Sequence, residues 1–182
     1  MKFILTRHST TEWNSAGRIQ GHTDIPLDQQ GKAEAEQLAK ALSGLGINLI
    51  VSSDLKRSSE TAQIVNKVLA VPLQLDKRLR EGSFGKIEGL TKQQAIEQFG
   101  SLVAPNWEDQ YRAYDFRPFG GEHRDDVLAR HIEVLRSLVS EKPNSTILLV
   151  GHARGLRTLL DGLGQSPELK RGDYRIVEYN LV

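Results

Sequence analysis

Short apolar runs alternate with segments of helical periodicity along most of this chain, and this alternation constrains its fold more than any other feature. The apolar runs are expected to be strands and cover residues 2–6, 49–52, 146–150 and 174–181. The periodic segments are expected to be helices and cover residues 30–42, 56–69, 91–99, 125–141 and 155–163. Such an order is typical of a mostly parallel sheet with helices on both faces. The sequence therefore predicts an α/β fold with three layers, α/β/α, around a mostly parallel central sheet.

Composition excludes several classes of function. The 182 residues include 24 Lys and Arg and 23 Asp and Glu, which gives a formal net charge of +1. This balance offers no overall attraction to nucleic acid or to an anionic membrane, so any anion site must be local. Cysteine is absent, which excludes thiolate chemistry and a cysteine-based metal site. Because neither a signal peptide nor an apolar stretch of roughly 20 residues is recognisable, we expect a single cytoplasmic domain over residues 1–182.

Two of the expected strands lead into a histidine. The run Phe3-Ile4-Leu5 precedes Arg7-His8 and a long polar loop, and the run over residues 147–150 precedes Gly151-His152. Ligands of open α/β sheets bind at the carboxyl ends of the strands, so both imidazoles are predicted at one rim of the sheet. An Arg-His pair alone is usually a surface or capping pair, and a Gly-His pair alone is usually a turn whose histidine already has its hydrogen-bond partners. Their recurrence in one chain favours an anion site that contains a nucleophile.

Further charged residues lie at expected element ends. Arg57 falls in the first turn of the helix over 56–69, where a cation is unfavourable unless an anion binds there; a snorkelling surface arginine is the alternative. Residues 80–89 form a glycine-punctuated loop that carries two carboxylates. Glu81 is a candidate general acid if burial favours its protonated form, and a solvated loop glutamate is the alternative. For Glu88 a solvated loop glutamate is expected, although its glycine neighbours leave room for a structural hydrogen bond.

Taken together, these segments resemble the histidine phosphatase superfamily, also called the phosphoglycerate mutase-like family. Arg7-His8 resembles its signature dipeptide, and the later blocks are Thr11 to Asn14, Arg18 to Leu27, Ser52 to Arg57, Leu79 to Glu81 with Gly85 and Glu88-Gly89, Gly120-Gly121-Glu122, and Gly151-His152. Each block is weak by itself, but their order along almost the whole chain is specific. The resemblance implies a phosphoglycerate mutase-like fold.

The resemblance also implies roles for individual residues. The catalytic residues would be His8 as the nucleophile, Glu81 as the proton donor to the leaving oxygen, and His152. The phosphoryl group would be held by His152 and by a phosphate-binding set that consists of Arg7, Arg57, Asn14, Gln20 and Gly21. Because the arginine cage takes the place of a metal ion, no metal and no cofactor is implied. The expected partners are a small phosphorylated substrate and inorganic phosphate.

Two positions depart from the family pattern. Ser9 and Ala153 stand where the family usually has glycine, and Ser9 raises the question of a crowded or weakened pocket. Arg154 adds a cation beside the expected phosphate site, with a surface arginine as the alternative. Arg154 and Glu122 are candidate substrate-specificity residues. The least regular stretch, residues 101–124, is expected to be a lid that sets specificity, and most of its aromatic residues are expected to pack in the core of that lid.

The sequence of residues 20–27 resembles the corresponding block of small phosphatases, of the α-ribazole phosphatase or broad-specificity type. Mutases of the family typically have tryptophan after the glycine of that block and a longer insertion. The expected function is therefore metal-independent hydrolysis of a phosphomonoester through a phosphohistidine. Phosphoglycerate mutase-type phosphoryl transfer remains an alternative, as do a non-catalytic phosphate-binding regulatory domain and a two-component phosphohistidine phosphatase, which is usually smaller.

Overall fold

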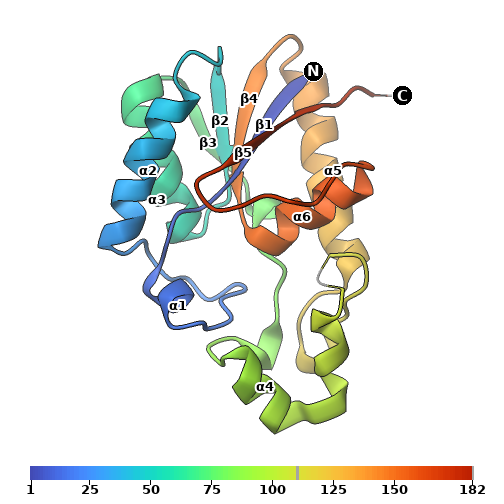
Figure 1. Ribbon diagram of the computed structural model, residues 1–182. Coiled ribbons are helices and arrows are strands. Elements are labelled where there is room, and N and C mark those ends of the chain that lie inside the picture. The colour runs from blue at the N-terminus through green and yellow to red at the C-terminus, as the bar shows by residue number, and fades with distance from the viewer. Residues whose placement is uncertain (110, 182) are drawn as a thin grey trace.

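The computed structural model describes residues 1–109 and 111–181 (Figure 1). Gln110, in the expected lid, and Val182, at the end of the expected domain, lie outside the described residues. The centre of the molecule is one five-stranded sheet in the order β3-β2-β4-β1-β5. Its strands are β1 (Lys2–Arg7), β2 (Leu49–Ser52), β3 (Leu73–Leu75), β4 (Thr146–Gly151) and β5 (Tyr174–Glu178). Four strands run parallel and β5 pairs antiparallel with β1, so the predicted, mostly parallel sheet is confirmed.

The register of the parallel strands brings the two histidine motifs together. In the β1–β4 pair, Arg7 lies opposite Gly151, so His8 and His152 follow the sheet at the same edge. Ser52 at the end of β2 lies opposite Val150, which adds the segment before Arg57 to that edge. The carboxyl ends of three neighbouring strands therefore lie at one edge, and the prediction that both histidines follow the sheet at one rim is confirmed.

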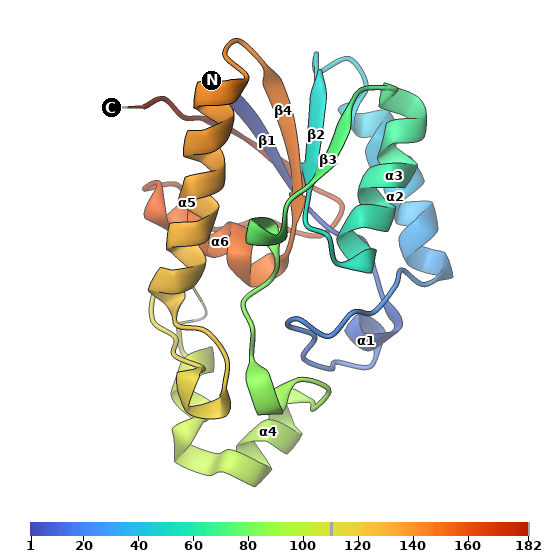
Figure 2. The same ribbon diagram turned by 180° about the vertical axis from the view of Figure 1, so that it is seen from behind.

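Helices cover both faces of the sheet, as Figures 1 and 2 show. On one face, α2 (Gln29–Leu42) and α3 (Lys56–Leu69) pack over inward residues such as Ile4 and Ile50. On the other face, α5 (Arg124–Glu141) and α6 (Ala153–Gly162) pack over the alternate strand residues, such as Leu5 and Leu149. Strand side chains alternate between faces, so one apolar run supplies both layers. The three-layer α/β/α architecture is confirmed.

Several element boundaries differ from the sequence prediction for identifiable reasons. Strand β3 was not predicted, because it has only three residues and lies at the edge of the sheet, where Leu75 is half exposed. So short a segment shows no recognisable alternation of apolar and polar residues. Strand β5 ends at Glu178, three residues early. The helical spacing of Thr61, Ile64, Val65 and Val68 predicts one buried face on α3, but Val68, one residue before the end of that helix, is 53% exposed. Conversely, Thr91 and Gln94 have the spacing that predicts a capping box, and this box is present at the start of α4 (Lys92–Phe99).

An additional region, outside the three layers, lies beyond the carboxyl edge of the sheet. The short helix α1 (Glu12–Ser15) breaks the long polar loop after β1, and α4 with short 3₁₀ turns forms an extension that Figure 1 shows away from the strands. This extension has its own apolar cluster, in which Tyr114, Phe116 and Phe119 are buried. The prediction that most aromatic residues of the expected lid are core is confirmed for these three. Among the described residues, no helix is long and apolar enough to cross a membrane.

The buried His131 of α5 predicts a pH-dependent stability. Its Nδ1 donates to the carbonyl of Val127 over 2.8 Å, the side chain is fully buried, and burial lowers its pKa to about 3. The unfolded chain takes up a proton near pH 6.5 and the folded chain does not, so the wild type should lose about 2 kcal/mol of stability between pH 6.5 and 5 through this group. Urea unfolding of His131→Leu should show a shallower loss over that range.

The cavity-forming change Val134→Ala on the same helix is the control for that experiment. Val134 is fully buried and does not titrate, so this variant should be destabilised equally at both pH values. Parallel pH dependences for wild type and His131→Leu would contradict a neutral, buried His131.

Candidate active site

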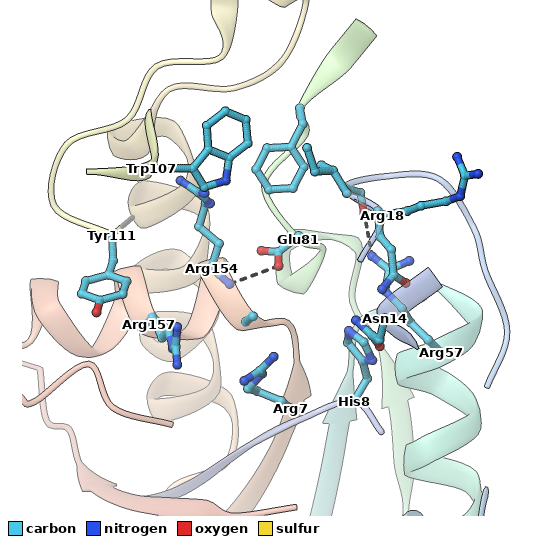
Figure 3. A pocket seen from close by; sticks show the side chains of 15 residues that line it. Arg7, His8, Asn14, Arg18, Arg57, Glu81, Trp107, Tyr111, Arg154 and Arg157 are labelled. Carbon is cyan, nitrogen blue, oxygen red and sulfur yellow. Dashed lines mark hydrogen bonds between the residues drawn. The ribbon is translucent and has the colours of Figure 1, made fainter. Parts of the chain in front are cut away.

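A cavity of about 290 Å³ lies at the carboxyl ends of β1 and β4, between the sheet and the extension (Figure 3). Its lining residues come from segments far apart in the sequence and are Arg7, His8, Asn14, Arg18, Ile19, Gln20, Gly21, Arg57, Glu81, Phe84, Trp107, Tyr111, Ala153, Arg154 and Arg157. Eight of the residues predicted from the sequence are therefore brought together. His152 lies directly behind His8, with their ring centroids 5.1 Å apart, and does not itself line the cavity.

His8 is held as a neutral imidazole with one nitrogen free. Its Nδ1 lies 2.7 Å from the carbonyl oxygen of Ser9, and because a carbonyl can only accept, Nδ1 carries the proton. The lone pair is therefore on Nε2, the nitrogen available to an electrophile. Burial, and then the nearby charge of Arg57, hold the pKa of His8 well below its ordinary value. A neutral imidazole with a fixed tautomer is the form that attacks phosphorus.

Arg57 is a buried cation fastened from three sides. The side chain is fully buried, and burial lowers its pKa to about 10, so it remains charged at neutral pH. Its Nη1 and Nη2 donate to the carbonyls of Thr23 and Gly21 over 2.8 and 2.6 Å, and its Nε donates to His152 over 3.3 Å. A guanidinium has five N–H groups, so within the described chain two remain for an anion. The alternative of a snorkelling surface arginine is wrong.

His152 supports Arg57 from behind. Because Arg57 can only donate, His152 Nδ1 must accept, and its Nε2 then donates to the hydroxyl oxygen of Ser53 over 2.9 Å. Burial lowers the pKa of His152 well below its usual range, which favours this neutral form. Both ring nitrogens are thus occupied by protein groups in this structure.

Glu88 fixes the loop of residues 21–23, whose carbonyl groups bind Arg57. Its carboxylate accepts the backbone N–H groups of His22 and Thr23 over 3.0 and 2.9 Å and the hydroxyl of Thr23 over 2.7 Å. Gly21 has a φ of +54°, and a Cβ there would collide with the Glu88 carboxylate, so only glycine fits. The expectation of a solvated loop glutamate is therefore wrong for Glu88: it makes structural hydrogen bonds, and these position the two carbonyls that bind Arg57.

Glu81 is buried at the opposite wall of the cavity, where Figure 3 shows it beside Arg154. Its carboxylate accepts the backbone N–H groups of Arg154 and Gly155 over 3.1 and 2.8 Å, and that of Gly82 over 3.0 Å. Two of these bonds satisfy free amides in the first turn of α6, which begins at Ala153 and not at the predicted residue 155. The alternative of a solvated loop glutamate is wrong.

The remaining predicted phosphate ligands also face the cavity. Arg7 donates from Nη1 to the carbonyl of Leu169 over 3.2 Å, its Nε has no partner among the described residues, and burial lowers its pKa to about 10. The amide oxygen of Asn14 accepts from the backbone N–H of Thr11, and that of Gln20 accepts from the Thr11 hydroxyl, each over 3.1 Å. Since those oxygens are occupied, the amide NH₂ groups remain as donors toward an anion.

Two sequence expectations need correction and several lining residues were missed. Glu122 does not line the cavity, because its carboxylate is clamped by Arg130 over 3.0 Å and by the backbone N–H of Ser83 over 2.8 Å. Ser9 is buried and not among the lining residues, so it does not crowd the cavity. The lining residues that were not predicted as site residues are Arg18, Ile19, Phe84, Trp107, Tyr111, Ala153 and Arg157. Arg157 could have been predicted as a lining residue, because it follows Arg154 by three residues on the same helix and therefore lies on the same face.

The cavity concentrates positive charge in a nearly neutral protein. Five arginines and one carboxylate line it, whereas the formal net charge of the whole chain is +1. Within residues 1–109 and 111–181, no group of three or more His, Asp or Glu side chains is placed to hold a metal ion. The arrangement can therefore bind an anion through guanidinium and amide donors and present it to the Nε2 of His8.

Sequence comparison finds relatives over most of the chain. PhoE of Bacillus subtilis, named as an uncharacterized phosphatase, is 30% identical over 167 residues, which are 91% of this chain and 79% of that protein. GpmB of Salmonella paratyphi A, named as a probable phosphoglycerate mutase, is 34% identical over 164 residues, which are 88% of this chain and 73% of that protein. Proteins named for both phosphatase and mutase activities are thus similar to this chain.

Solved structures share the fold. YhfR of Bacillus stearothermophilus superposes with a TM-score of 0.88 at 31% identity, covering 98% of this chain and 91% of that one. A mycobacterial glucosyl-3-phosphoglycerate phosphatase superposes with a TM-score of 0.84 at 28% identity, covering 97% and 92%. The predicted phosphoglycerate mutase-like fold is confirmed. Since the sequence model of the histidine phosphatase superfamily, branch 1, matches residues 3–179, this chain belongs to that superfamily.

Proposed function

We propose that this protein hydrolyses the phosphomonoester of a small metabolite, without a metal ion, through a phosphohistidine on His8. One observation carries the proposal: a neutral His8 presents a free Nε2 to a cavity whose other walls are arginines and one carboxylate. Phosphoryl transfer depends mainly on positioning and on charge that stabilises the equatorial oxygens. Arg7 and Arg57 supply planar donors for those oxygens, assisted by Asn14, Gln20 and the Gly21 segment.

In the first step of this proposal, the Nε2 of His8 attacks phosphorus and the bond to the substrate oxygen breaks. Glu81 must enter this step as the carboxylic acid; it gives its proton to the departing oxygen, so the alcohol leaves neutral and Glu81 is left as a carboxylate. In the second step, that carboxylate takes a proton from water, whose oxygen attacks the phosphohistidine. Inorganic phosphate leaves, and His8 and Glu81 return to their starting forms. His152 contributes by fixing the Nε of Arg57.

Hydrolysis and mutase chemistry differ only in what attacks the phosphohistidine. We propose that residues 101–124 act as a lid over the site and that this lid is short enough to admit water. Trp107 and Tyr111 reach the cavity from this segment, and Arg18, which is exposed, lines its mouth. With ³²P-labelled 3-phosphoglycerate, label should appear in inorganic phosphate. Label that moves instead to another phosphoglycerate position would favour the mutase alternative, and an absence of any turnover over a broad phosphomonoester screen would favour a regulatory phosphate-binding domain.

Activity should survive exhaustive chelation, because guanidinium groups supply the charge that a metal ion would otherwise supply. Hydrolysis of p-nitrophenyl phosphate, measured before and after dialysis against EDTA, should be unchanged. Vanadate should inhibit competitively, since it adopts the five-coordinate geometry of the transition state; the mycobacterial relative has been solved with VO₃. A loss of activity that one divalent ion specifically restores would overturn the metal-free part of the proposal.

A further inference from the structure

The fourteen arginines of this protein differ in their partners, and three of them, Arg136, Arg171 and Arg175, neither form an ion pair with a described residue nor line the cavity. Six make ion pairs with carboxylates: Arg78, Arg80, Arg112, Arg117, Arg124 and Arg130. The five that line the cavity make no such pair with any described residue. Arg7 and Arg57 suffice to neutralise one phosphoryl dianion. The others therefore provide positive charge that a singly phosphorylated, otherwise neutral substrate would leave unmatched.

Arg154 is buried at the cavity wall and is not the surface arginine that the sequence also allowed. It is 8% exposed, and its guanidinium lies over the rings of Phe84, Tyr114 and Phe116 at 5.2, 4.7 and 5.1 Å. Such contacts hold a guanidinium in place without satisfying its N–H groups. One of them donates to the carbonyl of Asn106 over 3.3 Å, and the others have no partner within the described chain.

Arg157 lies one turn further along α6, on the same face. Its Nε is buried without a partner among the described residues, and its guanidinium lies 5.6 Å from the centre of the Tyr111 ring. Like charges at this spacing repel each other, and cations near the N-terminus of a helix oppose its dipole. Two unpaired arginines here are unfavourable for the empty protein, and a bound anion offsets both effects.

From these contacts we infer that Arg154 and Arg157 form a subsite for a second anionic group of the substrate, a carboxylate or a second phosphate. The inference rests on the proposed function, because it names the class of phosphomonoester that the same cavity accepts. Figure 3 shows the two arginines across the cavity from His8 and Arg57. A substrate that bridges the walls is therefore held at both ends, with its phosphoryl group at His8.

The test compares pairs of ligands in which one member carries an additional anionic group. Glycerol 3-phosphate and 3-phosphoglycerate share a three-carbon skeleton, and fructose 6-phosphate and fructose 1,6-bisphosphate differ by one phosphate. Each is measured as a competitor of p-nitrophenyl phosphate hydrolysis, which gives an apparent Ki whether or not the ligand is turned over. In the wild type, the more anionic member of at least one pair should bind about tenfold to a hundredfold more tightly. The pair that shows this preference identifies the second group as carboxylate or phosphate.

The variants Arg154→Met and Arg157→Gln should reduce that preference by about tenfold each, because they remove a charge and keep a side chain of similar length. Arg112→Gln is the matched control: it removes one arginine from the same region, but Arg112 pairs with Asp161 and does not line the cavity. The control should keep the wild-type preference. Thermal unfolding of each variant shows whether loss of the packing around Arg154, rather than of its charge, alters the fold.

Either of two results would overturn the subsite. One is a wild type that binds both members of both pairs equally. The other is a preference that changes equally in Arg112→Gln and in the two subsite variants, since that would reflect only the overall field. If the wild type hydrolyses no phosphomonoester, the proposed function fails separately, and calorimetric affinities for the same ligand pairs then decide the subsite.

Discussion

Replacing His8 with alanine should abolish the phosphoenzyme and lower kcat/KM for phosphomonoesters by about 10⁴-fold or more. The reason is that the Nε2 of His8 carries a free lone pair in a fixed tautomer, and no other nitrogen of the described cavity has one: the arginines are protonated, and both nitrogens of His152 are occupied. Alanine leaves the arginine cage in place, so phosphate binding should weaken far less than turnover. The measurement is kcat/KM for p-nitrophenyl phosphate together with the Ki of inorganic phosphate.

The covalent intermediate can be trapped directly. Rapid quenching in alkali of wild type mixed with a ³²P-labelled phosphomonoester should retain label on the protein, and subsequent acid treatment should release it. A phosphoramidate bond is stable to alkali and labile to acid, whereas a phosphoserine behaves in the opposite way. Peptide mapping should place the label on His8.

Ser9→Ala is the control for this labelling experiment. Ser9 is the adjacent hydroxyl, and its carbonyl, which fixes the His8 tautomer, is unaffected by a change of side chain. Ser9→Ala should therefore label normally. Acid-stable label in His8→Ala, or the loss of label in Ser9→Ala alone, would assign the nucleophile to the serine and would end the phosphohistidine mechanism. Unfolding temperatures of both variants identify any loss that reflects folding only.

The central layer of this fold was predictable from the sequence because its signals are local. The apolar runs that form β1, β2 and β4 are buried on both faces, so composition alone reveals them. The placement of His8 and His152 at one edge then follows from the parallel register. The antiparallel direction of β5 and the presence of β3 were not predictable, since both depend on pairing with strands distant in sequence.

The cavity was predictable where a side chain follows a strand and unpredictable where it is set by distant contacts. His8 and Arg57 belong to the first kind. The binding of the first amides of α6 by Glu81 belongs to the second, because the carboxylate and the amides of Arg154 and Gly155 are more than 70 residues apart. The burial of Arg154 under three aromatic rings and the clamping of Glu122 by Arg130 likewise arise only when the extension folds over the sheet edge.

Replacing Glu81 with glutamine should impair substrates with poor leaving groups about 10²–10⁴-fold more than aryl phosphates. An alkoxide is a poor leaving group and needs a proton as the bond to phosphorus breaks, whereas a nitrophenolate leaves unaided. Glutamine keeps the size of the side chain and one oxygen acceptor but has no proton to donate. A plot of log kcat/KM against the leaving-group acidity of a series of phosphomonoesters should therefore be steeper for Glu81→Gln than for wild type.

Glu81→Gln also weakens the hydrogen bonds at the start of α6, and the experiment must separate this effect from the loss of the proton donor. The NH₂ group of glutamine cannot accept from a backbone amide, so one of the bonds to the first turn of α6 is lost, and turnover of every substrate should fall by a common factor. Glu88→Gln is the matched control: it weakens the loop that holds Arg57 without touching the leaving oxygen, so it should lower kcat/KM for all members of the series alike. Equal slopes for wild type and Glu81→Gln would show that Glu81 only positions α6. A steeper slope in Glu88→Gln instead would transfer the role of proton donor to Glu88.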